Sequence, residues 1–466
     1  MGGRFQPAPV TAPLMAHRSA AVTAALGEVD GRTVSWFRLE GGKHRGAIGV
    51  AEGGALERAV RAGVELGVPV VGIVSTSGAD VGEGVASLHA WGRVARALTD
   101  ASGVVPTLLA VIGPCVSGPA LLLGLVDHVV MTGDAFAYVS GPDTVTAFTG
   151  TPVTHESLGG AAVHRRRSGV AALTVADEDE ARLALAMLLA YLPENNLEDP
   201  PRIATDDPVE RDCAVAAAAV PERPSASYDV RAVVEDVLDS ESFLELRPDY
   251  AANMVTGLGR LDGRVVGVVA NQPGQRAGTL DIEASRKAAR FVQWCDAFNL
   301  PIVTFVDTPG FEPGRDLEWR GMIRHGAELV HAYAAATVPR VGVVLRKAYG
   351  GAYIVMDSKT LGNDWCIAWP GAQIAVMGAP PAVQVLHRRR LAAIADPDAR
   401  RAEQRALEDE YATRYLNPFA AAERGYVDDV VDALDTRRAL AAALGRLATK
   451  RETAPLRPGR HANTPL

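Results

Sequence analysis

The sequence predicts an α/β protein made of two copies of one domain, each with a mainly parallel sheet flanked by helices. Two observations lead to this prediction. Similar segments recur along the chain at a nearly constant offset, and within each copy apolar, strand-like runs alternate with helix-like runs. Alternating strands and helices indicate βαβ units. Strands that are apolar along their whole length fit a sheet that is covered on both faces.

The repeat is visible at three places. "DGRTVSWF" begins at Asp30 and "DGRVVGVV" begins at Asp262, an offset of 232 residues. The prolines of "ELGVPVVGIVSTSG" and "AFNLPIVTFVDTPG" have the same offset, and those of "GVVPTLLAVIGPCVSG" and "ATVPRVGVVLRKAYGG" have an offset of 233. Because unrelated segments would not keep this spacing three times, the chain contains an internal duplication.

Each copy carries its elements in the same order. Strand-like runs come first, and a helix follows them. A proline then opens a Val/Ile-rich strand that ends at a glycine turn, and after a second helix the same pattern of proline, strand and glycine turn returns. In the first copy we expect a strand at 34–39, a helix at 56–66 and glycine turns at Gly78 and Gly118. In the second copy we expect a strand at 265–270, a helix at 285–298 and glycine turns at Gly310 and Gly351.

The copies define the expected domains. The first domain covers residues 1–195 and the second covers residues 231–466. Residues 196–230 lie between them and are rich in Pro, Asp and Glu, which is typical of a linker.

Composition is that of an ordinary globular protein. Of the 466 residues, 48% are hydrophobic and 22% are charged, and the net charge of −8 gives no general attraction to nucleic acid or to acidic membranes. The four cysteines form no CxxC pair and the histidines show no metal-ligand spacing, so we expect no metal. The N-terminus lacks the layout of a signal peptide, and no apolar run reaches transmembrane length. We therefore expect a cytoplasmic protein.

The second glycine turn of each copy is a candidate functional site. A helix N-terminus leaves backbone N–H groups unpaired and carries partial positive charge, and glycine lets a ligand approach the backbone closely. Two such amides aimed at one carbonyl oxygen form an oxyanion hole. The repeat predicts two holes, at Ser117–Gly118 and at Gly351–Ala352. One glycine pair could merely permit a tight turn, but two pairs at equivalent positions favour function.

Several segments match a known family. They include "RKAYGGAYIVMDSKTL", "AWPGAQIAVMGAPPAVQVLHRRRL", "GPDTVTAFTGTPVTHESLGG" and "NPFAAAERGYVDDVV". These segments resemble the carboxyltransferase β subunits of biotin-dependent acyl-CoA carboxylases, nearest the actinobacterial acetyl-CoA and propionyl-CoA carboxylase type. The resemblance implies two tandem crotonase-fold domains. It also implies a homo-oligomer, a dimer or a hexamer, with each active site between subunits.

The resemblance also implies the reaction. A carboxyl group would move from carboxybiotin to the α-carbon of an acyl-CoA, with Gly351 and Ala352 facing biotin and with Ser117 and Gly118 facing the thioester. The chain has no Met-Lys-Met biotinylation site. Biotin is therefore expected on a partner that carries the biotin carboxylase and biotin carrier functions.

Further substrate-binding residues follow from the same resemblance. They are Ser77, Gly78, Ala79, His164, Ser168, Tyr353 and Ile354. Ile354 matches a position that tends to be Ile in acetyl-CoA enzymes and Asp in propionyl-CoA enzymes. Acetyl-CoA is therefore the favoured substrate, and propionyl-CoA is the next.

Two positions depart from the family pattern, and both lie in the first copy. The family's Ser-Gly-Gly-Ala-Arg is "TSGAD" here, which ends at Asp80, and its Ala-Gly-Gly-Ala is "VSGP", which ends at Pro119. Proline has no N–H to donate. A hole built from the amides of residues 117 and 118 would survive, whereas one built from residues 118 and 119 would lose a donor. An acyl-CoA decarboxylase or lyase on the same fold, and a non-catalytic complex subunit, therefore remain as alternatives.

Overall fold

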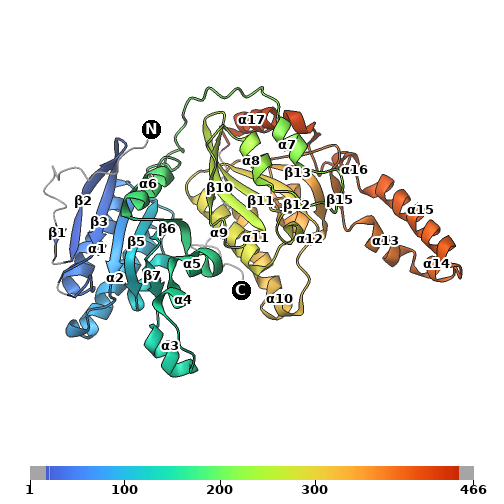
Figure 1. The fold of residues 1–466 in the computed structure, drawn as a ribbon. Helices are drawn as coiled ribbons and strands as arrows, with labels where there is room; N and C mark the ends of the chain where they lie inside the picture. The colour runs from blue at the N-terminus through green and yellow to red at the C-terminus, as the bar shows by residue number, and fades with distance from the viewer. Residues whose placement is uncertain (1–16, 20, 43, 451–466) are drawn as a thin grey trace, which may run out of the picture. The chain divides into compact units, whose positions relative to one another are not determined.

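The computed structural model describes residues 17–19, 21–42 and 44–450, and contacts within it divide the chain into two compact units (Figure 1). The first unit runs to Pro201 and also takes in Leu246–Tyr250 and Ala297–Asn299, and the second unit holds the rest. The start of the chain, where no signal peptide was expected, and the terminal "GRHANTPL", which also resembles the family, lie outside the described residues.

The first unit is built on one eight-stranded sheet. Its strands are β1 His17–Arg18, β2 Val22–Val29, β3 Arg32–Leu39, β4 Val70–Thr76, β5 Thr107–Val116, β6 His128–Thr132, β7 Phe136–Tyr138 and β8 Ala171–Val175. Its helices are α1 Val50–Leu66, η1 Val81–Glu83, α2 Val85–Ala101, η2 Gly118–Gly124, α3 Pro142–Thr149, α4 His155–Gly159, α5 Ala161–Val163, η3 His164–Ser168 and α6 Glu178–Leu189.

A second eight-stranded sheet organises the later part of the chain. Its strands are β9 Leu244–Leu246, β10 Met254–Leu261, β11 Arg264–Asn271, β12 Ile302–Thr308, β13 Arg340–Tyr349, β14 Trp365–Ala368, β15 Gln373–Ala375 and β16 Asp429–Val430. Its helices are α7 Ala214–Ala219, α8 Arg231–Val237, η4 Arg276–Gly278, α9 Ile282–Ala297, α10 Arg315–Trp319, α11 Met322–Ala335, α12 Gly350–Val355, η5 Lys359–Leu361, α13 Ala379–Leu386, α14 Arg388–Ala392, α15 Pro397–Tyr415, α16 Pro418–Ala422, η6 Ala433–Asp435 and α17 Thr436–Leu447.

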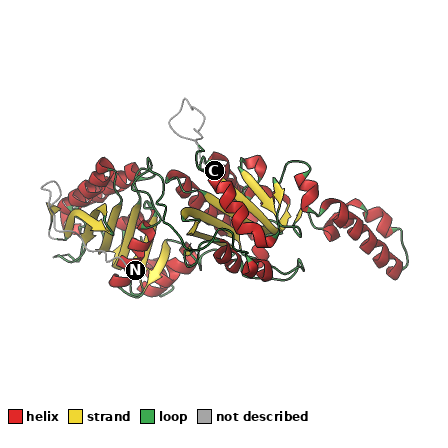
Figure 2. Cartoon of the chain, turned by 90° about the horizontal axis from the view of Figure 1, so that it is seen from above, coloured by secondary structure: helices red, strands yellow, loops and turns green. Residues whose placement is uncertain are grey.

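The two sheets have the same topology, which confirms the predicted fold class. In the first, an antiparallel hairpin β2–β3 leads into the parallel series β3–β4–β5–β6. In the second, β10–β11 leads into β11–β12–β13–β14 in the same way. Figure 2 shows helices flanking the strands of each unit. All seven residues of β12 are buried, as expected for a sheet covered on both faces.

Both sheets also share one irregularity, which the sequence did not predict. Between the paired residues Val306↔Val344 and Thr308↔Ala348, β13 carries two more residues than β12. Strands β4 and β5 show the same bulge at the equivalent place. A bulge bends its strand and changes the direction of the residues after it. Here it directly precedes the glycine turn in each copy.

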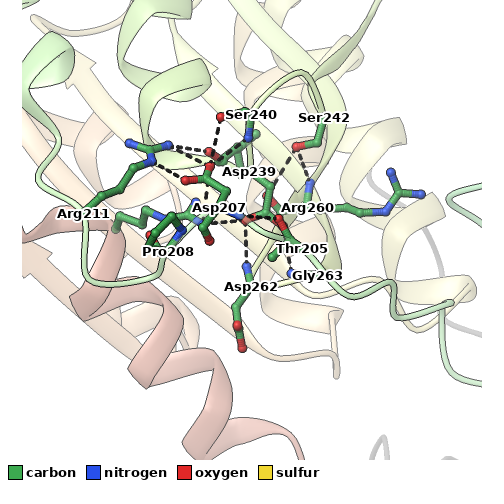
Figure 3. Close-up of polar contacts among 12 residues, drawn as sticks. Thr205, Asp207, Pro208, Arg211, Asp239, Ser240, Ser242, Arg260, Asp262 and Gly263 are labelled. Atoms are coloured by element: carbon green, nitrogen blue, oxygen red, sulfur yellow. Dashed lines mark hydrogen bonds and ion pairs between the residues drawn. The ribbon is translucent and has the colours of Figure 1, made fainter.

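The segment that was expected to be a linker is folded from residue 202 onward as part of the second unit. The guanidinium group of Arg437 on α17 is fully buried and donates hydrogen bonds to the carbonyl oxygens of Asp207 and Pro208. It also pairs with Asp239 at 2.7 Å, and the Asp239 carboxylate accepts the N–H groups of Asp262 and Gly263 (Figure 3). This cluster lies where β11 begins, which is the amino end of the parallel strands.

No helix among the described residues combines the length and the apolar character that a membrane span requires.

Candidate active site

The second glycine turn of each copy keeps one backbone geometry although its residues differ. Ser117 follows β5 with φ 64° and ψ −152°, and its counterpart Gly350 follows β13 with φ 60°. A positive φ is common for glycine but costs free energy for serine. The repeat therefore conserves a positive φ at this position even where the side chain disfavours it.

This strain gives a stability prediction. Replacing Ser117 by glycine should raise the free energy of unfolding by about 1 kcal/mol, because the strain of a non-glycine residue here exceeds the added chain entropy of glycine. Urea unfolding measures the change. Ser117→Ala keeps the Cβ atom and should give no gain. Equal stability of the two variants would show that the positive φ costs nothing.

The turns differ in the amides that they can offer. Helix α12 begins at Gly350, so the N–H groups of Gly350, Gly351 and Ala352 have no intrahelical acceptor. In the first copy, the Ser117 N–H donates to the Tyr138 carbonyl oxygen at 2.9 Å, and Pro119 has no N–H. The amide pair expected at Ser117 and Gly118 is therefore not open to a ligand here. Of residues 117–119, this leaves Gly118, the first residue of η2, because the Ser117 N–H is already hydrogen-bonded and Pro119 has no N–H.

The structure brings Gly78 to the first turn. A Cβ atom on Gly78, which has φ 106°, would lie 3.0 Å from Ser117 Cβ. On the other side of the turn, a Cβ on Gly118 would lie 3.0 Å from the Trp91 ring. Glycine is therefore needed at both places for close packing. Among the other expected substrate-binding residues, Ser77 precedes this loop glycine and Ala79 follows it.

His164 and Ser168 lie one strand away from the first turn. His164 Nδ1 is 2.7 Å from Ser168 Oγ, and its Nε2 is 2.8 Å from the carbonyl oxygen of Ala137. Ala137 pairs with Cys115 in the β5–β7 ladder. His164 and Ser168 are the first and last residues of η3, a π-helical turn, and this conformation is frequent at functional sites.

Tyr353 and Ile354 follow the second turn on α12. The Tyr353 side chain is buried, and its hydroxyl lies 3.5 Å from the Tyr426 carbonyl oxygen. Ile354 is 39% exposed. Of the two, Ile354 is the side chain that a ligand can reach in this structure.

The sequence reasoning missed the partner of Asp80. His44 Nδ1 lies 2.8 Å from Asp80 Oδ2, and this hydrogen bond is the largest cause that lowers the pKa of Asp80. At the repeat offset of 232 residues, these positions correspond to Arg276 and Glu312, which form an ion pair at 3.0 Å. Asp80 is therefore half of a duplicated clamp. The offset shows that the four positions correspond, but not that the residues pair.

Cys115 precedes the first turn but does not have the properties of a nucleophile. Its side chain is buried, and burial raises its pKa to about 12, so it stays protonated at neutral pH. Within the described ranges, no cluster of His, Cys, Asp and Glu could hold a metal ion.

Each of the two sheets carries a glycine turn at the carboxyl end of its long parallel strand, β5 in the first and β13 in the second. Comparison with known proteins identifies the class of protein that has this duplicated fold. The family model described as "Carboxyl transferase domain" matches residues 9–461. The chain belongs to this family, which confirms the resemblance seen in its motifs.

Individual relatives make the assignment more specific. A propionyl-CoA carboxylase carboxyltransferase subunit of Haloferax mediterranei is 47% identical over 446 residues, covering 96% of this chain and 86% of the relative. A biotin-dependent acetyl-/propionyl-coenzyme A carboxylase beta5 subunit of Mycobacterium leprae is 43% identical, covering 96% and 82%. The crystal structure of a transcarboxylase 12S hexamer with methylmalonyl-coenzyme A bound matches with a TM-score of 0.92 at 39% identity, covering 99% and 90%.

Proposed function

We propose that this chain moves a carboxyl group from carboxybiotin, carried by a partner protein, to the α-carbon of a short acyl-CoA. The observation that supports this most is the duplicated turn, which places helix-terminal amides at the carboxyl ends of equivalent parallel strands. The reaction creates negative charge on two oxygens, the ureido oxygen of biotin and the enolate oxygen of the thioester. Two separate amide sites suit two such oxygens.

The two sites have different roles in this proposal. The N–H groups of Gly351 and Ala352 receive the ureido oxygen, and the N–H of Gly118 receives the thioester oxygen. Ser77, Gly78 and Ala79 line the thioester side together with His164 and Ser168. The partner supplies biotin carboxylase and biotin carrier functions. We propose a homo-oligomer with sites between subunits. The hexameric assembly of the transcarboxylase 12S structure supports the homo-oligomer.

Acetyl-CoA is the proposed substrate, with propionyl-CoA next. Replacing Ile354 by Asp should shift the ratio of kcat/KM for propionyl-CoA over acetyl-CoA upward by about tenfold, the size of effect that one pocket contact has on discrimination between substrates one methylene apart. Competition between the two acyl-CoAs measures the ratio. Ile354→Val should leave it unchanged. Because Ile354 is partly exposed, the variant should fold.

Free biotin offers a test that does not need the partner. The purified chain is incubated with malonyl-CoA or methylmalonyl-CoA, with and without free d-biotin, and the release of acetyl-CoA or propionyl-CoA is measured. Release that depends on biotin supports the proposal. No turnover of either compound would count against it.

A second candidate follows from the first turn, where Ser117 N–H is engaged and Pro119 has none. An altered thioester site suits an acyl-CoA decarboxylase or lyase, or a non-catalytic complex subunit. Loss of CO2 from malonyl-CoA without biotin would identify the decarboxylase. Failure to bind CoA in calorimetry would identify the non-catalytic subunit.

A further inference from the structure

A buried polar cluster lies inside the bulge that precedes Gly350. Asp307 on β12 is fully buried, and its carboxylate accepts hydrogen bonds from Tyr228 Oη at 2.9 Å, Arg346 Nε at 3.0 Å and the Lys347 backbone N–H at 3.2 Å. Its own N–H donates to Asn271 Oδ1 at 3.2 Å. Where the register of β12 and β13 shifts, the Asp307 side chain therefore supplies a hydrogen bond to the β13 backbone in place of one from the β12 backbone.

Arg346 extends the cluster to a loop between α7 and α8. Its Nη1 donates to the carbonyl oxygens of Pro221, Arg223 and Ala226 at 2.9–3.3 Å. Its guanidinium also lies over the Tyr228 ring, 5.0 Å from the centroid. One buried arginine thus ties the bulge to this loop.

The first copy shows that the fold does not require these charges. At the repeat offsets, Asp307 and Arg346 correspond to Ser75 and Gly113. These two residues face each other as well, because a Cβ on Gly113 would lie 2.8 Å from Ser75 Oγ. Strands β4 and β5 still form the same bulge. The shared fold therefore does not by itself explain the cluster in the second copy.

Energetics also argue against a purely stabilising role. Removing an arginine and an aspartate from water costs free energy that their attraction only partly returns, so a buried ion pair is weak support for stability. The cluster is also incompletely satisfied, since Arg346 Nη2 and Asn271 Nδ2 are buried without an acceptor among the described residues. Buried polar groups without a partner are uncommon in native proteins and call for an explanation other than stability.

We propose that Asp307, Arg346 and Tyr228 are positioning residues that fix the end of β13, so that the amides of Gly351 and Ala352 point at the biotin-side oxygen. The inference rests on the proposed function for the identity of that oxygen. The backbone N–H of Lys347 donates a hydrogen bond to Asp307, and Lys347 is only three residues before Gly350. A change at Asp307 is therefore transmitted to the turn through a few backbone bonds of the same strand.

The test compares Asp307→Asn with Asp239→Asn. Asp239 is a matched control, because it also is a buried carboxylate that pairs with an arginine and accepts backbone N–H groups (Figure 3). It lies at the amino end of the parallel strands, whereas Asp307 lies at the carboxyl end. Both variants should lose thermal stability, and only Asp307→Asn should disturb the turn.

Hydrogen exchange followed by mass spectrometry gives the first readout. In Asp307→Asn, exchange of the peptide that spans Gly350–Met356 should rise about tenfold relative to wild type and to Asp239→Asn. This readout does not depend on any reaction. Equal exchange in the two variants would overturn the positioning role, whatever the wild-type chain catalyses.

Kinetics give the second readout. In biotin-dependent release from malonyl-CoA, Asp307→Asn should lower kcat about tenfold with an unchanged KM for malonyl-CoA, while Asp239→Asn keeps kcat within twofold. Tyr228→Phe removes one hydrogen bond and should show a smaller change of the same kind, which covers the case that Asp307→Asn fails to fold. Equal kcat values for Tyr228→Phe and wild type, together with unchanged exchange, would refute the proposal. A wild-type chain without biotin-dependent turnover would instead refute the proposed function.

Discussion

Replacing Ala352 by proline is expected to lower kcat for biotin-dependent carboxyl transfer about 100-fold. The change removes one N–H from the biotin-side turn, and loss of a single oxyanion-hole donor typically costs 100-fold or more. Proline is tolerated in the first turn of a helix, where Ala352 lies in α12. The first copy carries Pro119 at the equivalent position, the second residue of η2. Release of acetyl-CoA from malonyl-CoA in the presence of free biotin measures the loss.

Two comparisons separate a lost donor from a damaged fold. Ala352→Gly keeps the N–H and should retain most of the activity. Thermal melting of Ala352→Pro should stay close to wild type. Activity of Ala352→Pro within threefold of wild type would show that this amide does not face the developing charge.

The duplication made the fold predictable. Because β-strands of the two copies were aligned by their prolines, the sequence predicted the order of strands and helices and the place of each glycine turn. Helix starts were less accurate: α1 begins at Val50, before the expected 56–66, because small and acidic residues such as Glu52 give little apolar signal at a first turn. The bulge was not predicted, because it depends on pairing between strands that are distant along the chain.

The candidate site was predictable only in part. Glycine spacing indicated both turns, but the hydrogen bond from Ser117 to Tyr138 depends on β7, a three-residue strand with no clear pattern of its own. In the sequence Asp80 looks like an isolated reversal of charge, because its partner His44 precedes α1 in the chain and Asp80 follows it. The Asp307 cluster was missed because its residues come from four separate segments. In each case the missing information is a tertiary contact.

Replacing Pro119 by alanine is expected to raise kcat by roughly 30-fold. The variant restores an N–H beside that of Gly118, and we expect about 2 kcal/mol of added stabilisation for the enolate oxygen, below the ~3 kcal/mol of an optimised donor. The two turns share a positive φ at their first residue, 64° at Ser117 and 60° at Gly350, and we expect the restored amide to point as its counterpart does. Biotin-dependent release of acetyl-CoA is the measurement, and the same change in an Ala352→Pro background should leave the biotin-side defect in place. An unchanged rate for Pro119→Ala would mean that the thioester oxygen is held by other donors, of which the nearby amide of Ala79 is the first to test.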